Sequence, residues 1–438
     1  MSCRNLSKIK SSCLIFYYLK ENRNSFRFLL GSIEKNKFLL KNYDFFFVYS
    51  PKDLKNIFST ITSYKRKIFC FSFFSTQIED VLKISTYLRR KEVTKIVGGA
   101  FATSHYEIFL KMGFDYVSVG EAEDSFPLLL EGIIKERIPS NIEGVAYLKK
   151  DRIFFKSRSK SVEINNYLPI SRYFKKIGPI EITRGCPYQC KFCSTPFIFD
   201  KKVRHRHLDN ILQAVRIMKK LGFSDVRFLS PNAFSYFSSG KTPNLEMIEK
   251  LLKKTREIVT SKGKIFFGSF PSEIRPDFIN REGIRLLKKF VNNDNIIIGA
   301  QSGSNRLLKS LYRGHAKEDV IEATRITTQG GFKAYIDIIL GFPDETYEDR
   351  KETIKFIEEL IKLKAKIHLH YFLPLSGTPF FLKKPSFLEK EIKKKIEEWE
   401  GRGKIFGQWR KQLILSQKLS IFNENFLKKV TKDKKLPP

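Results

Sequence analysis

The sequence predicts an α/β protein with a Rossmann-like open parallel sheet at the N-terminus, a partial (β/α)6 TIM-like barrel after it, and a helical C-terminal tail. Three observations support this fold. Short apolar runs alternate with amphipathic helical stretches along most of the 438 residues, as in strands joined by crossover helices. The alternation loosens once and then resumes in six further strand–helix units. After Pro385 the chain becomes Lys-rich and helical in pattern, with no further strand evident.

These changes of pattern divide the chain into four parts. A chain of 438 residues is too long for one ordinary core, so two domains plus a tail are expected. The expected parts are an open-sheet domain (1–140), a linker with a hairpin (141–177), the partial barrel (178–384) and a basic helical extension (385–438).

The first domain should contain five strands separated by helices. The expected strands are 14–19, 43–49, 68–74, 95–97 and 116–119, and the clearest helices are 78–90 and 105–112. Gly98 and Gly99 follow the fourth strand, and Gly120 follows the fifth. Glycine lets the backbone approach a ligand closely at the carboxyl end of a parallel strand.

The second domain repeats the strand–helix unit six times. The expected strands are 180–183, 225–229, 264–267, 296–299, 334–340 and 367–372. The expected helices between them are 208–221, 244–259, 284–290, 317–329 and 347–363. In β/α barrels the chemistry lies where strands end, and the notable polar residues of this chain fall there.

Composition restricts the function only loosely. The formal charge of +35 would attract nucleic acid or other polyanions, but the lysines are spread along the whole chain, as on solvated faces. We therefore do not favour nucleic acid as the partner. No apolar stretch approaches 18 residues and the N-terminal apolar run lacks a cleavage site, so we expect a cytoplasmic protein without membrane spans.

Three of the six cysteines lie within eight positions of one another. Cys186, Cys190 and Cys193 follow the first barrel strand in a C-x3-C-x2-C spacing. Thiolates are soft ligands that suit iron–sulfur clusters or zinc. Three of them can hold three corners of a cubane cluster and leave one iron open, whereas a closed zinc site needs a fourth ligand. His205 or His207 could supply that ligand, so zinc is the structural alternative.

The remaining cysteines are isolated. Cys13 and Cys70 lie in apolar, strand-like runs, and Cys3 lies in a polar leader. So few cysteines in so long a chain do not make a disulfide framework. We interpret these three as ordinary small residues.

The clustered motif resembles that of the radical S-adenosylmethionine (SAM) superfamily. The resemblance implies a 4Fe–4S cluster on the three cysteines and SAM bound through the open iron. It further implies reductive cleavage of SAM to methionine and a 5′-deoxyadenosyl radical, with an electron donor such as flavodoxin or ferredoxin. Similar segments continue through about residues 178–382. None of these motifs encodes the substrate.

The same resemblance assigns further residues to SAM. The second barrel strand ends in Ser-Pro-Asn, where the superfamily usually has a Gly-Gly-Glu-like turn. Segments after the next two strands resemble those that meet the ribose and the carboxylate of SAM. The implied cofactor-binding residues are Ser230, Asn232, Ser272, Glu273, Arg275, Gln301, Ser302 and Arg313. From the residues alone, these could equally be caps, turn formers and surface cations.

The first domain resembles the cobalamin-binding domain that precedes many such barrels. The corresponding strand ends carry Ser75, Thr76, Gly98 and Gly99. The Asp-x-His-x-x-Gly motif that supplies a cobalt ligand in some cobalamin proteins is missing, and His105 fits a helix start better than a cobalt ligand. Cobalamin is therefore implied by the resemblance and the fold alone. A domain that serves as a platform for a substrate or partner is the alternative.

Three functions from different classes follow. The leading hypothesis is a radical SAM enzyme that uses cobalamin for a methyl transfer or a related rearrangement. The second is a tRNA-modifying enzyme like the methylthiotransferases, which carry three further N-terminal cysteines and a C-terminal RNA-binding β-barrel that are not evident here. The third is a basic nucleic-acid-binding protein with a structural metal site, although no recognisable reading module is present.

Overall fold

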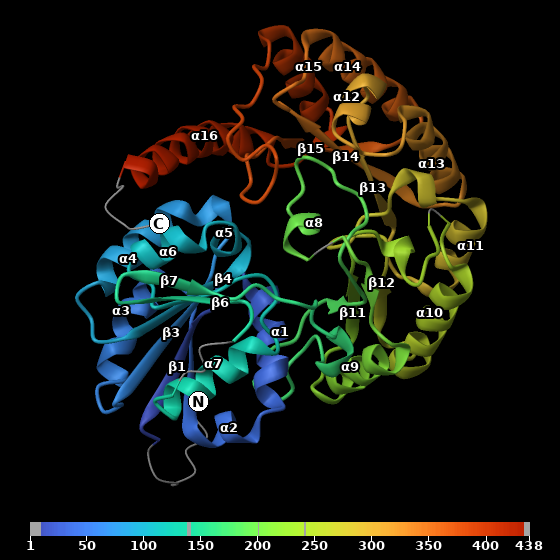
Figure 1. The fold of residues 1–438 in the computed structure, drawn as a ribbon. Helices are drawn as coiled ribbons and strands as arrows, with labels where there is room; N and C mark the ends of the chain where they lie inside the picture. The colour runs from blue at the N-terminus through green and yellow to red at the C-terminus, as the bar shows by residue number, and fades with distance from the viewer. Residues whose placement is uncertain (1–9, 138–141, 200, 241, 433–438) are drawn as a thin grey trace. The chain divides into compact units, whose positions relative to one another are not determined.

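The structure is a computed structural model that describes residues 10–137, 142–199, 201–240 and 242–432. It divides after Lys176 into two compact units, each with its own sheet and core (Figure 1). Cys3 lies outside the described residues.

A seven-stranded sheet forms the centre of the first unit, in the order β2-β1-β3-β4-β5-β6-β7. Its strands are β1 (Ser12–Tyr17), β2 (Tyr43–Val48), β3 (Arg66–Ser72), β4 (Thr94–Gly98), β5 (Tyr116–Ser118), β6 (Val145–Lys149) and β7 (Arg152–Phe155). The first five strands pair in parallel. The order 2-1-3-4-5 is that of a doubly wound α/β sheet, so the Rossmann-like prediction is confirmed.

The hairpin expected in the linker belongs to this sheet instead. β6 pairs antiparallel with β5, and β7 pairs antiparallel with β6. The backbone of β6 pairs with the edge that β5 would otherwise leave open. Val145 and Ala146 are buried in that position. The sequence shows a hairpin but not the strand that it will pair with.

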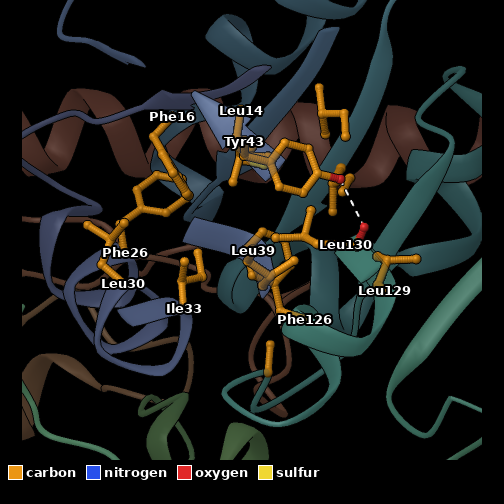
Figure 2. Close-up of a cluster of buried hydrophobic side chains, with 14 of the residues drawn as sticks. Leu14, Phe16, Phe26, Leu30, Ile33, Leu39, Tyr43, Phe126, Leu129 and Leu130 are labelled. Carbon is orange, nitrogen blue, oxygen red and sulfur yellow. Dashed lines mark hydrogen bonds between the residues drawn. The ribbon is translucent and has the colours of Figure 1, made fainter. Parts of the chain in front are cut away.

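Helices cover both faces of the first sheet. They are α1 (Arg23–Glu34), α2 (Lys37–Asn42), α3 (Pro51–Thr60), α4 (Ile78–Leu88), α5 (Gly99–Ser104), α6 (Tyr106–Lys111) and α7 (Ser125–Ile134). Figure 2 shows the core under α1, α2 and α7, into which Leu14 and Phe16 project from alternate positions of β1. The Tyr43 hydroxyl donates to the Leu130 carbonyl across this core at 2.9 Å. The helix expected over 105–112 begins one residue later, because His105 has a non-helical φ of −139°.

The second unit is a partial barrel. Its barrel strands are β8 (Ile180–Glu181), β11 (Asp225–Leu229), β12 (Lys264–Phe266), β13 (Asn295–Gln301), β14 (Lys333–Leu340), β15 (Lys366–Tyr371) and β16 (Ile405–Phe406). They form two parallel sheets, β12-β11-β8 and β13-β14-β15-β16. The Ile297 N–H donates to the Gly268 carbonyl at 2.9 Å and connects the two sheets. The predicted partial barrel is confirmed.

Helices cover the outside of the barrel strands (Figure 1). They are α9 (Leu208–Lys220), α10 (Leu245–Val259), α11 (Arg281–Phe290), α12 (Asn305–Ser310), α13 (Lys317–Gln329), α14 (Tyr347–Lys362) and α15 (Lys390–Gly401). The short helix α8 (Thr195–Ile198) lies within the ring of strands, and α16 (Trp409–Lys432) extends beyond them (Figure 1). Along β14, buried residues alternate with partly exposed ones, Tyr335, Asp337 and Ile339. These three lie on the inner face, because α13 packs against the other face.

The C-terminal part differs from the expectation in one respect. α15 and α16 are helical as predicted, but β16 lies between them and pairs in parallel with β15. Within the described ranges, no helix has both the length and the apolarity needed to cross a membrane.

Candidate active site

The cysteine loop leaves the barrel at a buried ion cluster. β8 is followed by the short strand β9 (Thr183–Arg184), which pairs antiparallel with β10 (Arg204–His205). The Glu181 carboxylate accepts from Arg184 Nε at 2.8 Å and from Arg206 Nη2 at 2.7 Å. Gly185 then turns the chain with a φ of +85°, a conformation that favours glycine. The start of the loop is therefore held by charge pairs inside the barrel.

The three predicted thiols share this loop. Cys190 is buried, and the Cys193 N–H donates to its carbonyl at 3.0 Å. Burial raises the pKa of the Cys186 thiol to about 11, and burial also raises the pKa of Cys193. The thiols lie close enough that the charges of Cys190 and Cys193 add to the rise at Cys186. Buried thiols of this kind become thiolates readily only beside a strong positive charge.

The spacing of the thiols does not suit a single zinc ion. Thiolates on one tetrahedral zinc lie about 3.8 Å apart. Among the described residues, the one set of three metal-ligand side chains whose donor atoms all lie within 4.8 Å of one another is Asp337, His368 and His370, not the cysteines. His205, proposed above as a fourth zinc ligand, has its Nδ1 3.0 Å from the Thr183 hydroxyl. The wider spacing fits a cluster of several irons better.

Arg313 supplies the positive charge beside the loop. Its Nη1 donates to the Cys190 Sγ at 3.7 Å, and its Nη2 donates to the Gly299 carbonyl at 2.6 Å. Nη2 also lies 3.4 Å from the Glu273 carboxylate. Burial raises the pKa of Glu273, and the charge of Arg313 opposes that rise. A Cβ on Gly299 would lie 2.6 Å from Glu273 and 2.7 Å from Arg313, so the pair requires glycine there.

Three buried donors near this charge pair have no hydrogen-bond partner among the described residues. They are Nδ2 of Asn232, Nη1 of Arg275 and Nε of Arg313. Arg275 is held in place by Asp277, at 3.0 Å for each of two bonds, and lies 3.5 Å over the ring of Tyr188. Buried polar groups rarely remain unpaired. Unpaired donors on three predicted residues therefore fit a bound ligand with carboxylate and hydroxyl acceptors.

The remaining predicted residues of the barrel hold the backbone. The Ser272 hydroxyl donates to the Phe228 carbonyl and accepts the Ser230 N–H, both at 2.9 Å. Gln301 is buried at the end of β13 with a φ of +76°. Ser302 differs from the others, since its hydroxyl lies 3.2 Å from that of Thr353 and accepts the Ser304 N–H at the start of α12.

Sequence reasoning named no role for His315. Burial lowers the pKa of His315 to about 3, and the charges of Arg313 and Arg275 add to the effect. It is therefore a neutral imidazole beside the two arginines. The sequence offered one indication of this position. His315 ends a Tyr-Arg-Gly-His stretch, two residues after Arg313, so the two residues must lie near each other.

The predicted residues of the first unit lie at the carboxyl edge of its sheet. Ser75 and Thr76 form a short 3-10 helix, Ser75–Gln77, after β3. Gly98 ends β4, and Gly99 begins α5 with a φ of +90°. A Cβ on Gly99 would lie 2.8 Å from the backbone N and O of Phe73, so adjacent strand ends approach closely there. Such an edge is where doubly wound sheets bind ligands.

An open parallel sheet and a partial barrel, with a loop of three thiols beside a buried arginine, together define a two-domain α/β protein. Residues 180–357 match the Radical SAM superfamily, and residues 27–130 match the B12 binding domain. The chain therefore carries a radical SAM domain and, ahead of it, a B12-binding domain. The first domain type implies a 4Fe–4S cluster and SAM as cofactors, and the second implies cobalamin.

Several curated proteins are similar to this chain. A Methanocaldococcus jannaschii protein named provisionally as a methylthiotransferase is 26% identical over 67% of this chain and 65% of its own length. A Methanopyrus kandleri protein is 24% identical over 66% of this chain and 62% of its own length. The tRNA-2-methylthio-N(6)-dimethylallyladenosine synthase of Thermosipho melanesiensis is 28% identical over 70% of each chain. This chain thus spans just under two thirds of the first two relatives.

Solved structures share the fold. The radical SAM methyltransferase TsrM of Kitasatospora setae, with cobalamin and a [4Fe–4S] cluster bound, matches with a TM-score of 0.66 at 14% identity over 85% of this chain and 74% of its own. The cobalamin-dependent radical enzyme OxsB, with aqua-cobalamin bound, matches with a TM-score of 0.59 at 16% identity over 80% of this chain and 52% of its own. Identities this low show a shared fold.

Proposed function

We propose that this protein cleaves SAM reductively at a 4Fe–4S cluster held by Cys186, Cys190 and Cys193, and that cobalamin in the first unit takes part in a methyl transfer or a related rearrangement. When bound, the cluster supplies the electron that splits the sulfonium into methionine and a 5′-deoxyadenosyl radical. The single observation that supports this function best is the Arg313 guanidinium, which contacts Cys190 and belongs to a group of buried, unpaired donors.

The residues around the loop have distinct tasks in this proposal. Arg313 places a buried positive charge 3.7 Å from the sulfur of Cys190, where it would offset the negative charge of a thiolate-bound cluster. Asn232 and Arg275 offer their unpaired donors to the carboxylate and ribose of SAM. Phe192 packs against Phe342 at 5.3 Å between ring centroids and keeps water from the loop.

The setting of the enzyme belongs to the same proposal. We place it in the cytoplasm, where thiols remain reduced, and expect an electron donor such as flavodoxin or ferredoxin.

Cys190→Ala tests the proposal. The variant should fold but yield no 5′-deoxyadenosine with dithionite and SAM under anaerobic conditions, because only two thiols remain on the loop. Chromatography of the products and the iron and sulfide content are the measurements. Cys13→Ala is the matched control, since Cys13 is buried in β1 of the other unit, and it should keep both activity and iron. Cleavage at the wild-type rate in Cys190→Ala would exclude the cluster assignment.

A methylthiotransferase-like tRNA-modifying enzyme is the second candidate. The names of two relatives and the charge of +35 favour it. Among the described cysteines outside the loop, Cys13 and Cys70 are buried strand residues, and burial raises the pKa of Cys13 to about 12. They are therefore poor ligands for a second cluster. Filter binding of tRNA in the presence of excess heparin decides between the candidates, since the charge of +35 alone gives salt-dependent binding to any polyanion, whereas a tRNA-modifying enzyme should retain tRNA against the competitor.

A further inference from the structure

A second polar cluster lies on the inner face of β14 and β15. Asp337 and His368 are register partners on these neighbouring strands, and Asp337 Oδ1 lies 2.9 Å from His368 Nδ1. His370 Nε2 lies 3.2 Å from the same Nδ1. The side chains of Asp337, His368 and His370 are 16%, 30% and 25% exposed, so the cluster is accessible from inside the barrel. None of the predicted SAM or cluster residues belongs to it.

Gln412 lies beside His370 in this cluster. The Tyr371 N–H donates to Gln412 Oε1 at 2.9 Å, and the amide nitrogen of Gln412 lies 3.3 Å from His370 Nδ1. Burial lowers the pKa of His370, and the neighbouring His368 lowers it further, so His370 is neutral.

The contact with Asp337 makes His368 a base. A contact of 2.9 Å between a carboxylate and an imidazole nitrogen requires a proton, which Nδ1 of His368 donates to Asp337. The lone pair of neutral His368 is then on Nε2. A carboxylate that fixes the tautomer of an imidazole and stabilises its protonated form is the arrangement of a general base. The ring of His368 stacks on Phe406 at 4.7 Å and 7°, which holds its orientation.

His368 lines a cavity of about 380 Å³ to which Asp337 and His370 do not contribute. Arg227 of β11 lines the same cavity and lies 3.7 Å over the ring of Phe266. Tyr335 and Phe406 add two further aromatic walls. The nearby amide of Asn292 is already bonded to Ile265 and Arg256. An imidazole and a guanidinium between aromatic walls suit a planar ring that can carry negative charge.

The cavity lies in the same barrel as the cysteine loop. Glu273 is electrostatically coupled to a charged group near each of them. Burial raises the pKa of Glu273, the charge of Arg313 lowers it and the charge of Asp337 raises it, so Glu273 is electrostatically coupled to both. The charged or titratable groups around His368 are Asp337 and His370, which contact it, and Arg227, Asp294 and Tyr335, which line the same cavity. The Asp294 carboxylate is paired with Lys333 at 2.8 Å.

We propose that Asp337 and His368 form a proton-transfer site for a planar aromatic or heteroaromatic substrate with an acidic O–H or N–H group. The proton passes from the substrate to Nε2 of His368, the imidazolium is stabilised by Asp337, and the substrate anion is stabilised by Arg227. The transfer needs no oxidant or reductant. This inference rests on the proposed function in one respect, because the deprotonation prepares the substrate for the radical step. The proton transfer itself does not depend on it.

4-Nitrophenol is a suitable probe, because it is planar and ionises near neutral pH with a visible colour change. Added to the reconstituted holoenzyme below its own pKa, it should give a saturable phenolate absorption. His368→Gln should abolish that absorption, and Asp337→Asn should weaken it about tenfold, because the imidazolium loses a hydrogen bond to a charged group. The exposed His207 provides the matched control, His207→Gln, which should behave as the wild type. 4-Nitroanisole, which lacks the acidic proton, should compete with 4-nitrophenol.

Two results would overturn the proposal. The first is a phenolate absorption that persists unchanged in His368→Gln, or that never forms in the wild type. The second is tight binding of cobalt(II) that both His368→Gln and His370→Gln abolish, since this would make the cluster a metal site. The optical titration requires no turnover, so its failure is distinguishable from a failure to cleave SAM.

Discussion

Glu181 balances the positive charges of two arginines at the point where the cysteine loop begins. Its carboxylate lies between Arg184 and Arg206, with side chains only 6%, 2% and 1% exposed. Burial acts to raise the pKa of Glu181, but the charges of the two arginines outweigh it, and the pKa lies below its usual value. The loop therefore starts from a carboxylate that remains ionised inside the barrel.

Glu181→Gln should destabilise the second unit by about 3–5 kcal/mol, because two buried arginines lose their counter-charge. A depressed pKa gives stability that is complete above the unfolded value of about 4.3 and is lost as the pH falls through the folded value. The wild type should thus lose stability below about pH 4.3 more steeply than Glu181→Gln. Fluorescence during urea unfolding reports this unit, since Trp399 and Trp409 both lie in it.

The exposed pair of Glu257 and Lys254 provides the control. Glu257→Gln should change the unfolding free energy by less than about 0.5 kcal/mol. Equal effects of the two substitutions would contradict the role given to the buried cluster.

For single residues, the sequence predicted those parts of the site whose chemistry depends on residues close together in the chain. The cysteine spacing is local, so the ligand set could be proposed without a structure. Asn232, Arg275 and Arg313 could be suggested only through the resemblance, and their unpaired donors emerge from the structure. The pair of Asp337 and His368 could not be found, because it depends on which strands pair and which alternate face turns inward.

At the scale of elements, Gly99 and Gly120 occupy equivalent turns after β4 and β5. Both have positive φ, +90° and +77°. A Cβ on Gly99 would overlap Ser72 and the backbone of Phe73 at 2.7–2.8 Å, whereas a Cβ on Gly120 would meet nothing within 4 Å. The first turn is therefore required by packing as well as by conformation.

Gly120→Ala should lower the free energy of unfolding by about 1–2 kcal/mol, because a residue with a Cβ is strained in the left-handed conformation. Gly99→Ala should cost at least about 1 kcal/mol more, because the overlap is with backbone atoms that cannot rotate away. Hydrogen exchange of peptides from β3 and β4, measured without added cofactor, gives both values. Equal protection in the two variants would show that the contact at Gly99 can relax.

Strands were predictable where their apolar pattern is strong. β11 spans the predicted 225–229, and α13 the predicted 317–329. β16 was missed because two residues in a Lys-rich segment carry no pattern of their own and become a strand only by pairing with β15. The hairpin of β6 and β7 was found but wrongly placed in a linker, since its partner β5 lies more than twenty residues earlier.

At the scale of the whole molecule, each unit has its own sheet and core, and each carries one of the proposed cofactor sites. Domains of this kind fold and bind independently to a first approximation. Hydroxocobalamin should therefore bind Cys190→Ala with an affinity within about threefold of the wild type. Conversely, a chain that loses cobalamin through Gly99→Ala should retain its iron. Loss of cobalamin from Cys190→Ala would show that the two sites are coupled.

The bound cobalamin should lack a histidine ligand from the first unit. His105 is the sole histidine before the cysteines, and its ring packs against Phe101 at 5.6 Å. Burial lowers the pKa of His105 to about 4, as expected for an imidazole inside an apolar core. His105→Gln should thus leave the visible spectrum of bound hydroxocobalamin unchanged. Its reduced cobalt(II) form should show no nitrogen coupling from this residue in electron paramagnetic resonance, and a spectral shift in the variant would place His105 on the cobalt instead.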